Sequence, residues 1–321
     1  MPLRRRIPCS ATHGTRTMTG NANGPLAGRK LVLGTVQFGL NYGISNVNGR
    51  PGESDVDLML QRARGGGIDT LDTASAYGDA EAVLGRLITA DDFRVITKTQ
   101  PVSATEVDAQ ALSQVESAFA RSLQRLGMPR VSCLMVHHGA DLLKPGGDQL
   151  FKLLMGLRER GLADRIGASV YDPEEAEAIM DRYPIELIQL PFNIVDQRVS
   201  RSGLLSRLKA RGVEVHVRSA FLQGALLMDP DSLPEHLAPL RTISAELRSA
   251  CGARGWSVQE ACLRFVAGTP GVDKVVCGVN SLGELKALIA NFHDRHDGFD
   301  FARFAIDDSV LVNPSKWPRV G

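Results

Sequence analysis

Residues 94–137 read RVITKTQPVSATEVDAQALSQVESAFARSLQRLGMPRVSCLMVH, in which two short apolar runs flank one long amphipathic segment. The runs Arg94–Lys98 and Val131–His137 have the length and apolar content of buried strands, and the segment 105–126 has the periodicity of a helix. A strand, a helix and a second strand in this order predict two parallel strands joined by a helical crossover.

The same alternation continues in both directions along the chain. Helical segments are predicted near 54–66, 79–88, 148–160, 173–182, 200–211, 240–267 and 281–292. The other predicted strands are Leu31–Val36, Ile68–Asp72, Arg165–Ser169, Leu187–Leu190, Val213–Arg218 and Lys274–Cys277. Eight strand–helix units favour closure into an α/β fold of the (β/α)8 TIM-barrel type, with a parallel eight-stranded barrel.

A doubly wound open sheet is the competing architecture. A dinucleotide-binding sheet of that type normally carries G-x-G-x-x-G after its first strand. Here the first predicted strand is followed by Gly34-Thr35-Val36-Gln37-Phe38-Gly39, which does not have that spacing. We therefore expect one barrel domain over 29–321, including a C-terminal tail. Residues 1–28 contain no acidic residue and show no periodicity, and we predict a disordered N-terminal extension there.

Composition narrows the functional classes. The 321 residues carry a formal net charge of +1, so no electrostatic footprint indicates nucleic acid or an anionic membrane. The five cysteines are scattered, which is unlike a disulfide framework or a structural zinc site and fits a reducing cytoplasm. We expect a cytoplasmic protein with a small-molecule partner and no metal, while the oligomeric state is left open.

Four reactive side chains follow three consecutive predicted strands. Asp72 ends the second strand and Tyr77 lies in the loop after it, Lys98 ends the third strand, and His137 ends the fourth. In a parallel barrel the carboxyl ends of the strands share one rim, so we expect these groups to meet there.

Together, these residue types suit the reduction of a carbonyl group. Hydride addition leaves alkoxide character on oxygen, which needs a proton from a positioned acid. We assign Tyr77 as that acid. Lys98 is expected to lower the pKa of Tyr77, Asp72 to hold Lys98, and His137 to bind the substrate oxygen.

The chain resembles the aldo-keto reductase family over about residues 30–292. The matching pieces, in family order, are Leu33-Gly34-Thr35 with Gln37-Phe38-Gly39, Asp72-Thr73-Ala74 with Tyr77-Gly78, Lys98, Leu134–His137, Ile166–Ser169, Gln189–Asn193 and Phe221–Gly224. The resemblance implies that Asp72, Tyr77, Lys98 and His137 form a catalytic tetrad. It also implies a nicotinamide cofactor, NADP(H) rather than NAD(H), bound by Gly34, Thr35, Ser169, Gln189, Arg218, Ser219, Gly278 and Ser281.

Some positions depart from the family pattern. Val170 replaces the usual Asn, and Arg218 stands where an aromatic residue usually stacks on the nicotinamide. Arg218 could stack in its place, or its charge could serve a phosphate or an acidic substrate. Asn280 and Glu284 occupy sites that are usually basic, with Lys274 and Lys286 nearby in sequence. Two other functions remain open, a Schiff-base lyase or aldolase using Lys98 and a non-catalytic cofactor-binding subunit.

Overall fold

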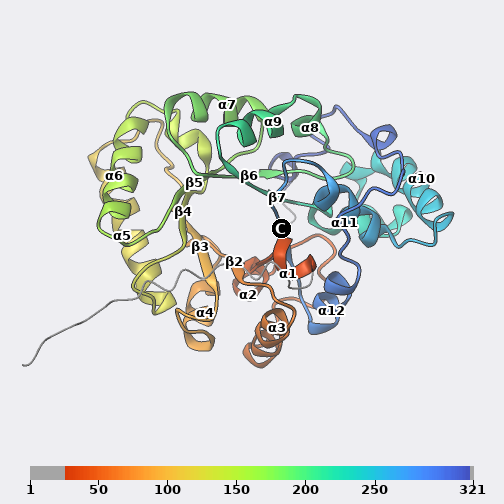
Figure 1. The fold of residues 1–321 in the computed structure, drawn as a ribbon, viewed down its shortest axis with the longest axis horizontal. Coiled ribbons are helices and arrows are strands. Elements are labelled where there is room, and N and C mark those ends of the chain that lie inside the picture. The colour runs from red at the N-terminus through yellow and green to blue at the C-terminus, as the bar shows by residue number, and fades with distance from the viewer. Residues whose placement is uncertain (1–25, 319–321) are drawn as a thin grey trace, which may run out of the picture.

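The computed structural model describes residues 26–318, and their eight strands close into a parallel barrel (Figure 1). Each strand pairs with the next along the chain, and the last pairs with the first. The strands are β1 (Leu31–Gly34), β2 (Thr70–Asp72), β3 (Arg94–Lys98), β4 (Cys133–Val136), β5 (Ile166–Ser169), β6 (Leu187–Pro191), β7 (Glu214–Arg218) and β8 (Lys274–Gly278). The predicted (β/α)8 barrel is confirmed.

Helices surround the strands in a ring, as Figure 1 shows. They are α1 (Leu26–Lys30), α2 (Val36–Gly39), α3 (Glu53–Gly65), α4 (Ala80–Leu87), α5 (Ala109–Leu126), α6 (Gly147–Glu159), α7 (Pro173–Arg182), α8 (Arg198–Arg201), α9 (Leu204–Ala210), α10 (Leu240–Gly252), α11 (Val258–Gly268) and α12 (Leu282–Ala290). Short 3-10 helices are η1 (Gly139–Leu142), η2 (Leu222–Leu227), η3 (Pro230–Ser232), η4 (Glu235–Leu237), η5 (Ala302–Phe304) and η6 (Pro314–Lys316).

Two predicted helices are each divided in the structure. The segment 240–267 forms α10 and α11, because Gly255 turns the chain with φ +69° and Ser257 starts a new helix by accepting a hydrogen bond from the Glu260 amide. The segment 200–211 is divided at Gly203, where φ is +74°. The predicted extension over 1–28 falls almost entirely on residues outside the described part of the chain.

Two apolar layers hold the barrel together. Leu134 and Val136 belong to a large core shared with the surrounding helices. Their strand neighbours Cys133 and Met135 belong to a separate cluster, with Ile96. Because successive strand residues point to opposite faces, this second cluster fills the barrel interior. Lys98 follows Ile96 by two residues and therefore also faces the interior, one layer nearer the carboxyl rim.

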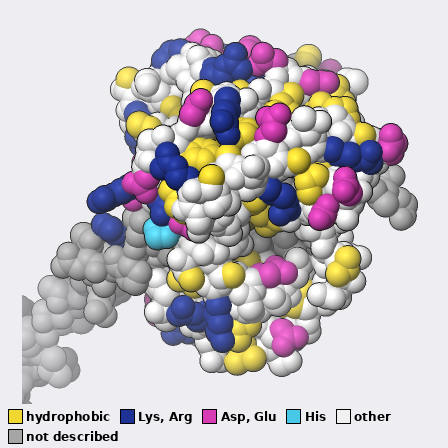
Figure 2. All heavy atoms as spheres, turned by 90° about the vertical axis from the view of Figure 1, so that its right-hand side faces the viewer, with side chains coloured by type: hydrophobic (Ala, Val, Ile, Leu, Met, Phe, Trp, Pro, Cys, Tyr) yellow, Lys and Arg dark blue, Asp and Glu magenta, His cyan; other side chains and the backbone are white. Residues whose placement is uncertain are grey.

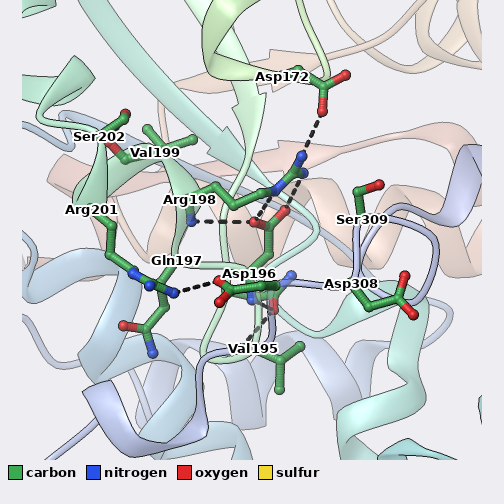
Figure 3. A network of polar contacts seen from close by, with 12 residues as sticks. Asp172, Val195, Asp196, Gln197, Arg198, Val199, Arg201, Ser202, Asp308 and Ser309 are labelled. Carbon is green, nitrogen blue, oxygen red and sulfur yellow. Dashed lines mark hydrogen bonds and ion pairs between the residues drawn. The ribbon is translucent and has the colours of Figure 1, made fainter.

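Polar contacts fasten the loops at that rim. Figure 3 shows Arg198 between Asp172 at the start of α7 and Asp196 after β6, at N–O distances of 2.5 and 2.8 Å. The amide of Ile306 donates to the Val195 carbonyl, which ties the C-terminal segment to the same loop. The loop after β6 is therefore anchored from two sides.

One face of the outer surface carries mixed charge (Figure 2). On the face shown in Figure 2, acidic and basic side chains alternate with hydrophobic ones and do not gather into a patch of one sign. Among residues 26–318, no helix is long and apolar enough to cross a membrane.

Candidate active site

A buried ion pair lies at the carboxyl rim. Lys98 Nζ is 2.6 Å from Asp72 Oδ1, and both side chains are almost fully buried. Lys98 also donates to the Thr73 carbonyl at 3.0 Å, while Gln189 Nε2 donates to Asp72 Oδ2 at 2.8 Å. Each carboxylate oxygen of Asp72 thus accepts a hydrogen bond from a buried side chain. Burial lowers the pKa of Lys98, but the charges of Asp72 and Tyr77 outweigh it and hold that pKa above its ordinary value.

Tyr77 stands beside this pair. Its hydroxyl oxygen is 3.5 Å from Lys98 Nζ, which is a long hydrogen bond. The turn that carries Tyr77 packs directly against α2, since a Cβ at Gly39 would come within 1.9 Å of the Tyr77 carbonyl oxygen. Gly78 follows with φ +53°, and a Cβ there would come within 2.5 Å of the Gly39 carbonyl oxygen. Close packing of two glycines therefore fixes the position of the phenol.

The pKa of Tyr77 corrects one expectation from the sequence. Burial raises it above its ordinary value, and the nearby Lys98 ammonium lowers it by less than burial raises it. The lysine does act in the predicted direction, but desolvation of the phenolate is the larger effect. Tyr77 therefore stays protonated at neutral pH, as a proton donor must.

His137 also lies next to the phenol. The two rings meet edge to face, with centroids 5.8 Å apart. Burial lowers the pKa of His137 to about 3, helped by the positive charges of Lys98 and Arg218. Its Nδ1 atom is buried without a hydrogen-bond partner among residues 26–318. A neutral imidazole keeps one N–H, which can donate to a substrate oxygen.

A cavity of about 520 Å³ opens from these four side chains and extends across β1 and β8 to α12. It is lined by all four predicted tetrad residues and by seven of the eight predicted cofactor-binding residues, Gly34, Thr35, Ser169, Gln189, Arg218, Ser219 and Gly278. Ser281 is the exception. It accepts a hydrogen bond from the Glu284 amide as the N-cap of α12 and is not among the lining residues.

The far end of the cavity is acidic or neutral. It is lined by Gln259, Asn280 and Glu284. The Glu284 carboxylate accepts a hydrogen bond from the backbone amide of Asn280. Lys274 starts β8 at the opposite end of the barrel and pairs with Asp69 at 3.5 Å. Lys274 therefore cannot take the role of a basic residue here, and Lys286 is not among the lining residues.

The lining suits a nicotinamide dinucleotide in size and chemistry. Pockets of about 300–1,000 Å³ are typical of sites for small molecules and cofactors. Ser169 and Gln189 offer uncharged polar groups near the tetrad. The side-chain oxygens of Gln37 and Asn280 are buried and have no partner in the described part of the chain. Such orphaned acceptors fit a ligand that brings hydroxyl and amide donors.

Other lining residues were not singled out by the sequence analysis. Tyr42 and Tyr171 reach the cavity from two separate loops, and Gln223 reaches it from η2. Tyr171 follows Ser169 by two residues, and this spacing was a usable signal for a side chain on the same face. Three residues after β7 have positive φ without being glycine, namely Ser219 (60°), Leu222 (49°) and Gln223 (54°). Such conformations cluster at functional sites.

Comparison with known proteins gives consistent matches. A family model described as "Aldo/keto reductase family" matches residues 30–305. An aldo-keto reductase of Mycolicibacterium smegmatis is 30% identical over 142 residues, covering 41% of this chain and 46% of the relative. An L-glyceraldehyde 3-phosphate reductase of Escherichia coli is 24% identical over 215 residues, covering 61% and 60%. The matches thus span only about half of these curated relatives.

Solved structures share the fold. An aldo-keto reductase from Bacillus halodurans in its holo form superposes with a TM-score of 0.66 at 20% identity, covering 82% of this chain and 86% of that one. A putative aldo-keto reductase from Pseudomonas aeruginosa gives a TM-score of 0.61 at 20% identity, with coverages of 82% and 88%.

Proposed function

Because the chain belongs to the aldo/keto reductase family, we propose that it reduces an aldehyde or ketone with NAD(P)H, using Tyr77 as the general acid. The observation that carries the proposal is the arrangement around Lys98. Its ammonium lies 2.6 Å from Asp72 and 3.5 Å from the Tyr77 hydroxyl, with His137 edge-on to the phenol.

Each side chain then has a role in proton transfer. The cofactor, when bound, supplies the hydride that reaches the carbonyl carbon. The Tyr77 hydroxyl donates its proton to the carbonyl oxygen, which becomes the alcohol of the product. Lys98 stabilises the phenolate that Tyr77 leaves, and Asp72 keeps Lys98 charged. Neutral His137 donates a hydrogen bond to the same carbonyl oxygen and so orients it.

Besides Arg218, six of the predicted cofactor contacts line the cavity and support a cofactor site there. Ser169 and Gln189 are proposed to bind the nicotinamide carboxamide, and Gly34 is proposed to lie beside the cofactor at the end of β1. The preference for NADP(H) expected from the family resemblance needs a cation for the 2′-phosphate. In the described part of the chain, the lining near α12 offers Glu284 and no cation. We therefore propose that NADH binds at least as well as NADPH. The preference for NADP(H) expected from the resemblance predicts the opposite affinity ratio, and titration with both cofactors decides between them.

A Schiff-base mechanism is disfavoured by the state of Lys98. A nucleophilic amine must be neutral, but the pKa of Lys98 is held above its ordinary value, and its Nζ atom is engaged by Asp72 and the Thr73 carbonyl. The other alternative, a non-catalytic cofactor-binding subunit, predicts that the protein binds the cofactor but turns over no carbonyl substrate. The cytoplasmic location expected from the cysteines likewise stays a prediction.

The test joins a binding measurement with a matched pair of variants. Fluorescence titration with NADPH and with NADH measures cofactor affinity, and a panel of aldehydes then measures turnover. The panel includes glyceraldehyde 3-phosphate because a relative is named for its reduction. Tyr77→Phe should lower turnover by about 10²- to 10⁴-fold while leaving cofactor affinity in place. Tyr183→Phe removes a phenol that bonds Asp148 and the Leu142 carbonyl, and it should retain turnover. Cofactor binding without turnover in the wild type would instead support the non-catalytic subunit.

A further inference from the structure

Arg218 is a charged side chain inside the barrel mouth. It ends β7, and His216, two residues earlier, is almost fully buried. His216 pairs in register with Gln189, whose side chain reaches Asp72 in the barrel interior. Residues two apart on a strand share a face, so Arg218 also faces the interior, one layer nearer the rim. It lines the cavity together with the tetrad.

The guanidinium of Arg218 is held from one side. It lies over the Tyr171 ring, 4.5 Å from the ring centroid, and one terminal nitrogen donates to the Val170 carbonyl at 3.1 Å. Stacking and this single hydrogen bond fix the plane of the group. A guanidinium has five N–H donors, so most of them are left for a ligand.

Within the described part of the chain, the charge of Arg218 has no counterion. Among residues 26–318, no carboxylate lies within 4.0 Å of its guanidinium. Of the two acids that line the cavity, Asp72 is occupied by Lys98 and Gln189. The other, Glu284, belongs to the α12 end. A partly buried cation without a counterion is costly unless an anion completes it.

Arg218 also faces the reacting groups. It lines the same cavity as Tyr77, His137 and Tyr42, and its charge lowers the pKa of all three. An anion bound by Arg218 would therefore sit beside the carbonyl that Tyr77 and His137 hold.

We propose that Arg218 binds a carboxylate or phosphate carried by the substrate, so that this enzyme prefers acidic aldehydes or ketones to neutral ones. The inference rests on the proposed carbonyl reduction and adds the substrate class. Planar guanidinium groups bind both kinds of anion through paired hydrogen bonds. Which anion is preferred depends on the space between Tyr42 and Tyr171, and the experiment separates the two.

The experiment compares matched substrates. Values of kcat/KM are measured for succinic semialdehyde against butanal, and for glyceraldehyde 3-phosphate against glyceraldehyde. We expect the acidic member of at least one pair to be favoured by about ten- to hundredfold, as a charge-assisted hydrogen bond provides. Arg218→Met should reduce that ratio to near one, mainly through KM, and Arg218→Lys should keep part of it.

Controls separate the substrate from the cofactor and from net charge. Arg201→Met removes the same charge at an exposed site, where Arg201 pairs with Asp307, and it should keep the wild-type ratio (Figure 3 shows Arg201). The NADPH affinity of Arg218→Met is measured by fluorescence. A ratio that is unchanged in Arg218→Met, or a loss of cofactor affinity with equal losses for both substrates, would overturn the inference.

A calorimetric binding experiment tests the anion site even if the protein reduces no aldehyde. Succinate and neutral succinamide are titrated calorimetrically into wild type and Arg218→Met. Succinate binding that weakens about ten- to hundredfold in the variant would support the anion site even though the reductase proposal had failed. Equal binding of succinate and succinamide by the wild type would reject the anion site itself.

Discussion

The lowered pKa of His137 makes the free energy of unfolding depend on pH. Its pKa is about 3 in the folded protein, against 6.5 for an unperturbed histidine. Below pH 6.5 the unfolded chain binds a proton at this position, and the folded chain does not until about pH 3. The unfolded state then holds more protons, so stability falls as pH falls.

The size of the effect follows from the same two values. Each pH unit below 6.5 costs about 1.4 kcal/mol until the folded protein also takes up the proton. Between pH 7 and pH 5, His137 alone should therefore remove about 2 kcal/mol from the free energy of unfolding. This is a large fraction of the stability of an ordinary domain.

Urea denaturation of wild type and His137→Gln at pH 7 and pH 5 measures this contribution. The glutamine amide does not titrate, so the loss of stability between the two pH values should be about 2 kcal/mol smaller in the variant. Other titrating groups contribute to both proteins and cancel. His138→Gln is the matched control because the His138 ring is exposed, and it should keep most of the wild-type pH dependence. Equal pH dependence in wild type and His137→Gln would refute the reasoning.

Three further predictions concern the neighbouring groups. Tyr77→Phe should lower kcat by about 10²- to 10⁴-fold in steady-state assays, with the urea midpoint nearly unchanged. Since burial holds the pKa of Tyr77 above its ordinary value, the reduction rate should fall with rising pH only in the region above about pH 10, as a pH–rate profile will show. Lys98→Met leaves the buried Asp72 carboxylate without its positively charged partner. The free energy of unfolding, measured by chemical denaturation, should fall by about 3–5 kcal/mol. Adding Asp72→Asn to the same chain should restore part of that loss.

The sequence predicted the barrel and the meeting of the tetrad because both depend on local patterns. Strand ends in a parallel barrel share a rim, so the order of Asp72, Lys98 and His137 along the chain is enough to bring them together. The break between α10 and α11 was missed although the sequence carries its signals. Gly255 is a typical helix end, and Ser257 followed three residues later by Glu260 is a typical helix start. Ser281 was placed at the cofactor from its position in the sequence, but its hydroxyl caps α12.

Contacts between distant loops could not be predicted in this way. The approach of Gly39 to the Tyr77 turn, and the stacking of Arg218 on Tyr171, join segments whose spacing carries no signal. The pKa of Tyr77 was missed for a related reason. The charges around it can be identified from residue types, whereas its desolvation depends on how completely the surrounding loops close.

Asp72 connects the two halves of the proposed site. A carboxylate only accepts hydrogen bonds, so the contact with Gln189 requires the amide nitrogen of Gln189 to face Asp72. The amide oxygen of Gln189 is thereby left to accept a hydrogen bond from a ligand, which suits the –NH2 group of a nicotinamide carboxamide. The other oxygen of Asp72 holds Lys98 charged beside Tyr77. One buried carboxylate thus sets both the orientation of the proposed cofactor contact and the electrostatics of the proton donor. In the proposed reaction, the orientation of the cofactor and the supply of the proton would therefore both depend on this one side chain.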